Sequence, residues 1–540
     1  MHTYNRLIGL LAILFAVFGC KSTTIDFKSE KKDFAQSKVR QQTNKKAITP
    51  NLKIMPAKKN YIKGSYFINE DLIIAKNTEL IIAKGSKLLF KRDCGIICYG
   101  SIKAKGIKEQ TIEFSAINKS EGWKGILFIG KKSSASFEYC NINSARSSKN
   151  FPDLKIRPFF KNYWKEMSRD QIGGALTCIN SGKIFLSHCF FVDNKAQLGG
   201  GILAWFSDVS ITNCKFIGNF AVCWGGSICA LNHSKIMITK SLFDNKDNKF
   251  IGEDIDSSGV LMYVEEFSFL CISDSEIVNN KTQNRAAIIT EYSDVFIQNT
   301  KFEYNFSTYA KDLTAFTKLV DSFLKGQNLH KMQGVFEGQF AGPSVIETNR
   351  SELTIINCDF SRNYGNVVDC YNTDVEITNS RFDNNFTDDD GVLSLSESAI
   401  TLSNCQFSRN HSFQQSAVSY MKESKFKIQN CIFSNNSVLG SSELTFAEGG
   451  VFVFEKSYGH LYDCKFIENS SKLYGGAIFQ VDTNKIYYHN CLFQKNSSSK
   501  GGAIALSFPT IDEDEEYIRN LRKDSIFKDN APDNVKIIED

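Results

Sequence analysis

The 540-residue sequence contains little proline, tryptophan or histidine, with 7, 4 and 7 residues respectively, and no large excess of either charge. No two histidines stand four residues apart, which excludes the helical metalloprotease motif. Lys and Arg number 64 against 59 Asp and Glu, for a formal net charge of +5. This balance argues against nucleic acid as the main partner. Phosphate-binding loops and nucleophile elbows are also missing.

Long apolar runs are missing as well, except at the N-terminus, where one extends from Leu7 to Phe18 after Arg6. It is too short to span a bilayer and is typical of a secretory signal. No later run reaches about 18 apolar residues, so we expect no transmembrane helix. Residues 1–20 are therefore assigned to a signal peptide.

The end of this segment, Val17-Phe18-Gly19-Cys20, resembles a bacterial lipobox in which the Cys is lipidated, although Phe departs from the usual second residue. Cys20 is the predicted lipidation site, and ordinary signal peptidase cleavage near Gly19 is the alternative. Residues 21–60 are rich in Lys, Ser, Gln, Asn and Thr, which predicts a flexible tether.

The rest of the chain repeats one short motif: Cys or Ser, any residue, Phe, two residues, Asn. A clear copy is Cys214-Lys215-Phe216 with Asn219. The most frequent spacing is near 25 residues, and the copies centre on Phe191, Phe216, Phe302, Phe360, Phe382, Phe407, Phe433, Phe466, Phe493 and Phe527, with Phe243 and Ile277 in degraded copies. Between these copies lies a second motif, Gly-Gly followed by two small or apolar residues, as in Gly475-Gly476-Ala477-Ile478.

Short alternating segments connect these marks and have the periodicity of strands, with no room for helices. One turn of such a chain cannot bury its apolar face alone, but stacking on the next turn buries it. We therefore predict an all-β, right-handed parallel β-helix over residues 61–540, a single domain of roughly sixteen turns. The Phe residues should stack in the core, the Asn residues should form a ladder at one corner, and the Gly pairs should allow positive φ at the next.

These marks resemble the GGAI and FxxN repeats of polymorphic outer membrane proteins of bacterial surfaces. Segments such as Tyr99-Gly100-Ser101-Ile102 and Gly122-Trp123-Lys124-Gly125 also resemble the opening turns of secreted right-handed β-helix proteins. The resemblance covers about residues 64–535. It implies the fold and a surface or secreted location, and it says almost nothing about chemistry.

Two large insertions, at about 146–172 and 305–342, fall in the same half of the repeat, so we expect both loop or helix insertions on one face of the coil. Insertions confined to one face of a solenoid often form its binding side. The first contains aromatic residues next to cations, which could stack on sugars and pair with acidic groups. The predicted ligand-contact residues are Arg157, Phe159, Phe160, Lys161, Tyr163 and Trp164. The alternative is that these aromatics only pack the loop onto the coil.

An acidic stretch lies between the two insertions and offers carboxylate ligands for Ca²⁺, although a solvated acidic loop is the alternative. Its candidate ligands are Asp244, Asp247, Glu253, Asp254 and Asp256. No other cofactor is predicted.

Half of the 16 cysteines share the repeat position two residues before the Phe, and Ser or Thr replaces Cys there in other turns. A position that accepts Cys or Ser calls for a small buried side chain, so we predict free thiols rather than a disulfide or zinc framework.

Three functions remain open. The preferred one is a secreted or surface-tethered, monomeric and non-catalytic scaffold that binds a carbohydrate or a cell-surface protein, with membrane attachment only through a lipid anchor. The second is a polysaccharide lyase or glycosidase acting on an acidic polysaccharide in a cleft between the insertions. The third is a structural surface protein without a ligand. No catalytic residue is predicted.

Overall fold

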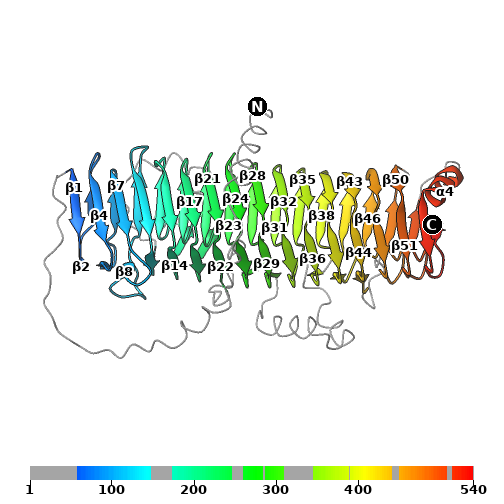
Figure 1. Ribbon diagram of the computed structural model, residues 1–540, viewed down its shortest axis with the longest axis horizontal. Helices are drawn as coiled ribbons and strands as arrows, with labels where there is room; N and C mark the ends of the chain where they lie inside the picture. The colour runs from blue at the N-terminus through cyan, green and yellow to red at the C-terminus, as the bar shows by residue number, and fades with distance from the viewer. Residues whose placement is uncertain are drawn as a thin grey trace, which may run out of the picture. The chain divides into compact units, whose positions relative to one another are not determined.

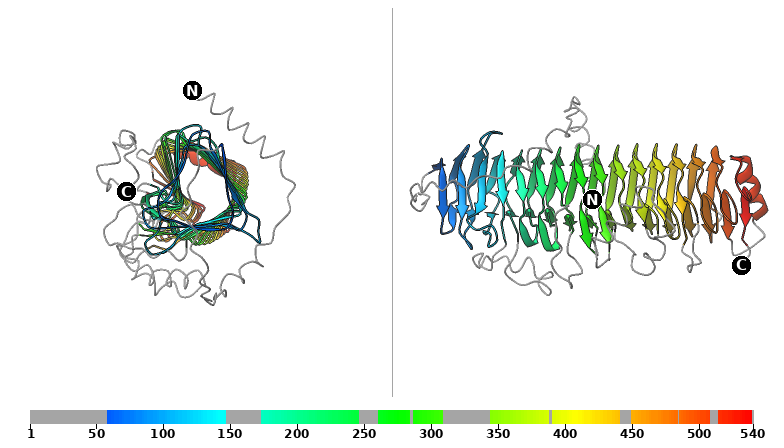
Figure 2. Two further views of the ribbon diagram at one scale, coloured as in Figure 1. Left: turned by 90° about the vertical axis from the view of Figure 1, so that its left-hand side faces the viewer. Right: turned by 90° about the horizontal axis from the view of Figure 1, so that it is seen from below.

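The structure is a computed structural model that describes residues 58–146, 173–245, 260–283, 286–308, 344–387, 390–440, 449–483, 485–507 and 514–538. Within these residues the chain forms three long parallel sheets, A, B and C, each built from one strand per turn (Figure 1). Seen end-on, the three sheets enclose a three-sided core (Figure 2). The predicted right-handed parallel β-helix is confirmed.

Sheet A contains 15 strands, which in spatial order are β1 (Lys59–Ile62), β4 (Glu79–Ala83), β7 (Ser101–Lys105), β10 (Ser134–Glu138), β13 (Ile184–Ser187), β17 (Asp208–Thr212), β21 (Lys235–Thr239), β24 (Phe269–Ser273), β28 (Asp294–Gln298), β32 (Glu352–Ile356), β35 (Asp374–Thr378), β39 (Ala399–Ser403), β43 (Lys425–Gln429), β47 (Tyr458–Tyr462) and β50 (Ile486–His489).

Sheet B contains 16 strands: β2 (Ser65–Ile68), β5 (Lys87–Phe90), β8 (Ile112–Ala116), β11 (Cys140–Asn143), β14 (Phe190–Val192), β18 (Lys215–Ile217), β22 (Leu242–Asp244), β25 (Glu276–Val278), β29 (Lys301–Glu303), β33 (Asp359–Ser361), β36 (Arg381–Asp383), β40 (Gln406–Ser408), β44 (Ile432–Ser434), β48 (Lys465–Ile467), β51 (Cys491–Gln494) and β53 (Ser525–Lys528).

Sheet C also contains 16 strands: β3 (Leu72–Ile74), β6 (Ile96–Cys98), β9 (Ile126–Ile129), β12 (Leu176–Ile179), β16 (Ile202–Trp205), β20 (Ile228–Leu231), β23 (Met262–Glu265), β27 (Ile288–Glu291), β31 (Ile346–Asn349), β34 (Val368–Tyr371), β38 (Leu393–Ser396), β42 (Ser419–Lys422), β46 (Phe452–Glu455), β49 (Ile478–Val481), β52 (Ile504–Ser507) and β54 (Val535–Ile537).

Short accessory strands follow sheet B in some turns and pair among themselves. They are β15 (Lys195–Leu198) with β19 (Phe220–Trp224), β26 (Lys281–Gln283) with β30 (Phe306–Thr308), and β37 (Phe386–Thr387), β41 (His411–Ser412) and β45 (Ser437–Val438) together. One helix, α4 (Asp514–Lys523), lies at the C-terminal end of the coil (Figure 1). The Tyr517 hydroxyl donates to the Ile486 carbonyl oxygen at 2.9 Å, which fixes the helix over the last turns.

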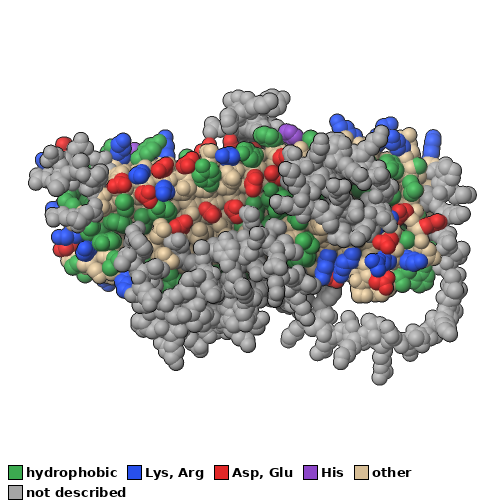
Figure 3. Space-filling view, turned by 180° about the vertical axis from the view of Figure 1, so that it is seen from behind, with side chains coloured by type: hydrophobic (Ala, Val, Ile, Leu, Met, Phe, Trp, Pro, Cys, Tyr) green, Lys and Arg blue, Asp and Glu red, His purple; other side chains and the backbone are tan. Residues whose placement is uncertain are grey.

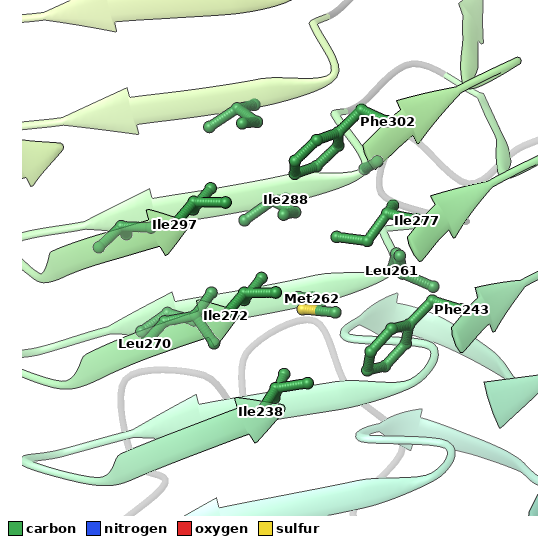
Figure 4. Close-up of a cluster of buried hydrophobic side chains, with 14 of the residues drawn as sticks. Ile238, Phe243, Leu261, Met262, Leu270, Ile272, Ile277, Ile288, Ile297 and Phe302 are labelled. Carbon is green, nitrogen blue, oxygen red and sulfur yellow. The ribbon is translucent and has the colours of Figure 1, made fainter. Parts of the chain in front are cut away.

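The repeated Phe residues form the predicted stack in the core. Phe382 and Phe407 lie 4.6 Å apart between ring centroids, with an interplanar angle of 6°. Each such aromatic contact contributes about 0.5–1.5 kcal/mol beyond simple burial. Ile277 takes the Phe position between Phe243 and Phe302, as the degraded copy of the motif predicted (Figure 4).

The repeated Asn residues form a fully buried ladder at the end of sheet B, also as predicted. The amide nitrogen of Asn385 donates to Asn410 Oδ1 at 3.0 Å, and that of Asn410 donates to Asn436 Oδ1 at 3.0 Å. Because each amide also donates to a main-chain carbonyl, the ladder satisfies polar groups that the corner would otherwise leave unpaired.

The Gly pairs lie where successive turns approach most closely. Gly475 has φ of 49°, the left-handed conformation predicted for this corner. A Cβ at Gly476 would lie 2.1 Å from the carbonyl oxygen of Gly502 in the next turn, so no larger residue fits there. In this pair the first Gly is required for backbone conformation and the second for close packing of turns.

The fifteen cysteines of the described residues are all free thiols. Those of the repeat column point into the core beside Ser residues that fill the same position in other turns. Burial raises the pKa of Cys358 to about 12, so this thiol stays protonated and unreactive at neutral pH.

Candidate functional site

The predicted ligand-contact residues lie outside the described residues. Arg157, Phe159, Phe160, Lys161, Tyr163 and Trp164 fall in the segment 147–172, and Cys20 falls in the segment 1–57. Of the predicted Ca²⁺ ligands, Asp247, Glu253, Asp254 and Asp256 are also outside, whereas Asp244 ends strand β22 and accepts a hydrogen bond from Asn279 Nδ2 at 3.4 Å. These sites therefore stay predictions.

The described residues flanking both predicted insertions lie at the corner between sheets B and C. Before the first segment the described coil ends at Arg146, whose guanidinium pairs with the Asp193 carboxylate at 2.7 Å, and it resumes at Gly173 before strand β12. Before the second segment the coil continues through strand β30 to Thr308, so it extends past the predicted start at residue 305, and it resumes at Ser344. The described residues on both sides of each segment thus belong to the same corner.

A row of exposed aromatic side chains runs along a different corner, between sheets C and A. We call this row the aromatic corner strip. It takes one residue from each of five consecutive turns, and all five are exposed: Phe206, His233, Phe267, Tyr292 and Arg350. Phe267 is 70% exposed, Tyr292 42% and Phe206 41%.

The side chains of the strip form two stacked groups, Phe206 with His233 and Phe267, and Tyr292 with Arg350. His233 lies 5.8 Å from Phe206 and 5.4 Å from Phe267 between ring centroids, with interplanar angles of 28° and 17°. The Arg350 guanidinium lies 5.4 Å from the Tyr292 ring centroid, and Arg350 Nη1 donates to the Tyr292 hydroxyl. A cation over an aromatic face stabilises such a pair by about 0.5–1 kcal/mol at an exposed site.

The backbone holds this row in place. Each strip residue has positive φ, from 47° at Phe206 to 58° at Phe267. The main-chain N–H of Phe267 donates to the Tyr292 carbonyl oxygen at 2.8 Å, and that of Tyr292 donates to the Asn349 carbonyl oxygen at 3.0 Å. A left-handed conformation costs roughly 1–2 kcal/mol for a bulky side chain, and Asn adopts it more readily.

Asn180 and Asn372 occupy the same corner in other turns with φ of 47° and 48°. The fold therefore accepts Asn at this position, and aromatic residues here carry backbone strain without gaining full burial. Because neither strand pairing nor core packing requires them, their chemistry is available to a ligand.

A second candidate surface consists of two carboxylate pairs on the outer side of sheet C. Glu265 pairs in register with Glu291 on strands β23 and β27, and Glu347 pairs in register with Asp369 on strands β31 and β34. The two pairs are offset by two residues along the strands, because Glu347 lies opposite Ile289. On the face that Figure 3 shows, acidic side chains gather in the middle part of the coil, while Lys and Arg side chains lie nearer its ends.

The Asp369 carboxyl is the perturbed member of the pair that it forms with Glu347. Burial raises its pKa above the ordinary value, although hydrogen bonds with the Ser394 and Ser344 hydroxyls act in the opposite direction. A carboxyl with a raised pKa beside a second carboxyl is a combination that acid–base catalysis uses.

Across the described ranges, no three His, Cys, Asp or Glu side chains come close enough to hold one metal ion. In the same ranges, no helix is both long and apolar enough to cross a membrane.

Residues 344–511 match the family model of the right-handed beta helix region. This match and the parallel sheets support a β-helix repeat protein. They do not distinguish the finer repeat type of the polymorphic outer membrane proteins, which stays an expectation. No curated protein matches the sequence.

Several solved structures are similar to this chain at low identity and with low TM-scores. PfbA, a surface adhesin of Streptococcus pneumoniae, is 14% identical with a TM-score of 0.27, over 75% of this chain and 84% of that chain. The catalytic unit of a GH87 alpha-1,3-glucanase from Streptomyces thermodiastaticus is 8% identical with a TM-score of 0.22, over 89% and 64%. The A-module of the mannuronan C-5 epimerase AlgE6 from Azotobacter vinelandii is 6% identical with a TM-score of 0.20, over 88% and 91%. These likenesses concern the fold alone.

The aromatic corner strip was not predicted from the sequence. A signal for it exists, because each strip residue directly precedes a Ser of one buried column. The Ser207 main-chain N–H donates to Ser234 Oγ at 3.1 Å, and the Ser234 N–H donates to Ser268 Oγ at 3.1 Å. Aligning the turns on this Ser column places all five strip residues in register.

Proposed function

We propose that this protein is an extracellular, surface-tethered β-helix that binds carbohydrate through the aromatic corner strip without catalysis. The observation that supports this function is the stack of exposed aromatic rings on consecutive turns, held by a rigid backbone. Flat aromatic faces contact the C–H faces of sugar rings, and a rigid side chain loses little entropy on binding.

The strip runs along the coil, and its residues rise by about 4.8 Å from one turn to the next. An extended polysaccharide chain could therefore lie along the strip and contact several rings at once. Arg350 at one end adds a cation for an acidic group, so a uronate-containing polysaccharide is the preferred ligand. The N-terminal signal and Cys20 would bring this surface to the cell exterior.

The test compares binding of alginate, polygalacturonate and neutral glucans by affinity electrophoresis and calorimetry. In the test variant Phe206, Phe267 and Tyr292 are all replaced by Asn, because Asn occupies this corner elsewhere with the same φ. This variant should fold at least as stably as the wild type and lose more than about tenfold in affinity, the effect of about 1.4 kcal/mol.

The matched control is the variant Phe185→Ala/Tyr371→Ala, which removes aromatics of 49% and 40% exposure outside the strip. It should bind as the wild type does. Equal affinity of the Asn variant and the wild type, or no binding of any of these polysaccharides by the wild type, would contradict the proposed site.

The carboxylates on sheet C support a second candidate function, cleavage of a polysaccharide. Glu347 and Asp369 lie on neighbouring strands, about 4.8 Å apart along the sheet, and the Asp369 carboxyl has a raised pKa. A turnover assay on the same polysaccharides would identify it: product formed by the wild type and lost in Glu347→Gln and Asp369→Asn would favour catalysis over binding.

A further inference from the structure

Two histidines that are 29 residues apart in sequence meet on the outer side of sheet A. His460 lies in the middle of strand β47, and His489 ends the neighbouring strand β50. The strand register places His460 beside Tyr487 and Tyr462 beside His489, so the two imidazoles are diagonal neighbours. His460 Nδ1 and His489 Nε2 are 3.2 Å apart. Strand β50 lies near the C-terminal end of the coil, several turns from the aromatic corner strip (Figure 1).

Two tyrosines fix the orientation of both rings. Tyr487 stacks on His460 with centroids 4.9 Å apart and an interplanar angle of 23°. Tyr462 stacks on His489 with centroids 4.5 Å apart and an angle of 11°. The imidazoles are only half-buried, so the pair is held by rigid neighbours and stays accessible to solvent.

The separation of the two nitrogens is that of two ligands on one metal ion. Zinc binds imidazole nitrogen at about 2.0–2.1 Å, and a tetrahedral angle then places two such nitrogens about 3.3 Å apart. Without a metal, one imidazole N–H points at the nitrogen of the other ring. A metal ion would lie to the side of the line that joins the two nitrogens, so both rings would tilt to bind it.

We propose that His460 and His489 together bind one divalent transition metal ion, Zn²⁺ or Cu²⁺, at the surface of sheet A. Imidazole ligands favour these ions over Ca²⁺ and Mg²⁺, which prefer oxygen. Among the described residues no third His, Cys, Asp or Glu joins the pair, so water or an oxygen of a bound molecule completes the coordination. This site is independent of the aromatic corner strip.

Isothermal titration of the full chain with ZnCl₂ and with CuCl₂ tests the site. His460→Ala or His489→Ala should each weaken binding by more than about tenfold, because losing a ligand costs at least as much as losing its outer-shell partner. The matched control is His188→Ala, which removes an imidazole that also stacks on a tyrosine, Tyr139, with centroids 4.5 Å apart. It should leave the affinity unchanged.

Lys427 gives a second, opposite test. Its ammonium lies 6.0 Å from the Tyr462 ring centroid and repels a cation at the pair, so Lys427→Gln should strengthen binding. The metal should also raise the melting temperature of the wild type and leave that of the double variant His460→Ala/His489→Ala unchanged. The proposal fails if the wild type binds neither ion, or if the double variant binds with wild-type affinity.

Discussion

Replacing Asn410 by Ala should destabilise the coil far more than replacing an exposed Asn of the neighbouring turn. Asn410 is completely buried in the Asn ladder. Its Nδ2 donates to the Phe382 carbonyl oxygen and to Asn436 Oδ1, both at 3.0 Å. Its Oδ1 accepts from the main-chain N–H of Asn385 at 3.1 Å and from Asn385 Nδ2 at 3.0 Å.

The expected magnitude follows from the groups that lose a partner. In Asn410→Ala the Phe382 carbonyl oxygen, the Asn385 N–H and one Asn385 amide hydrogen each lose a buried hydrogen bond. Asn436 Oδ1 still accepts from the main chain of residue 410 at 3.1 Å. At about 1 kcal/mol for each buried group left unpaired, the variant should lose about 3 kcal/mol.

The control is Asn430→Ala on the outside of the coil. Asn430 is exposed, has φ of 52°, and donates from Nδ2 to Asn404 Oδ1 at 2.6 Å. Water replaces this bond, so only the left-handed backbone preference of Asn is lost, about 1 kcal/mol.

Native-state amide hydrogen exchange is the appropriate assay, because each turn of a solenoid contacts only its neighbours and the loss should concentrate there. Exchange should accelerate most at the main-chain amide of Asn385, which loses its acceptor, and much less at distant turns. Equal effects of the two substitutions on exchange would refute the ladder as a main source of stability.

Two further predictions concern the half-buried His411 and the buried Cys405. Burial lowers the pKa of His411 to about 4 in the folded chain. The unfolded chain, with a His pKa of about 6.5, binds the proton more readily. The free energy of unfolding should therefore fall as the pH drops from about 6.5 toward 4, by at most about 3 kcal/mol. Denaturant unfolding at several pH values should show a smaller loss for His411→Asn than for the wild type. Cys405→Ser should change the free energy of unfolding by less than about 1 kcal/mol, and the melting temperature correspondingly little. The reason is that Ser380 fills the same position one turn earlier and donates to the Thr378 carbonyl oxygen at 2.9 Å. Cys405→Leu overpacks the same position, and equal melting temperatures of the two variants would contradict this account.

The parts of the fold in which the same residue type recurs from turn to turn were predictable from the sequence. The Phe stack and the Asn ladder each need one residue type at one position, because ring stacking and amide pairing require like partners in successive turns. Even Ile277 was placed correctly, since its turn kept the spacing of the motif. The helix α4 was not predicted, because it follows the last regular turns and no repeated motif marks it.

The candidate sites were less predictable, because outward positions carry no consensus. The corner between sheets C and A holds Asn180, Phe267, Glu397 and Lys456 in different turns, so no residue type marks it. His460 and His489 look unrelated in the sequence, and only the length of the intervening turn brings them together.

This separation of inner and outer positions explains how one coil can carry unrelated surfaces. At the corner between sheets C and A, the main chain of each turn bonds the next whatever side chain is present: the N–H of Phe267 donates to the Tyr292 carbonyl oxygen, and that of Glu397 donates to the Lys422 carbonyl oxygen at 3.0 Å. Both residues have left-handed φ, 58° and 49°. Because the inner columns fix the fold, folding does not require the four aromatic residues and Arg350 that occupy this corner on five successive turns. Recognition of an extended ligand, as we propose, is one function that such a run can serve.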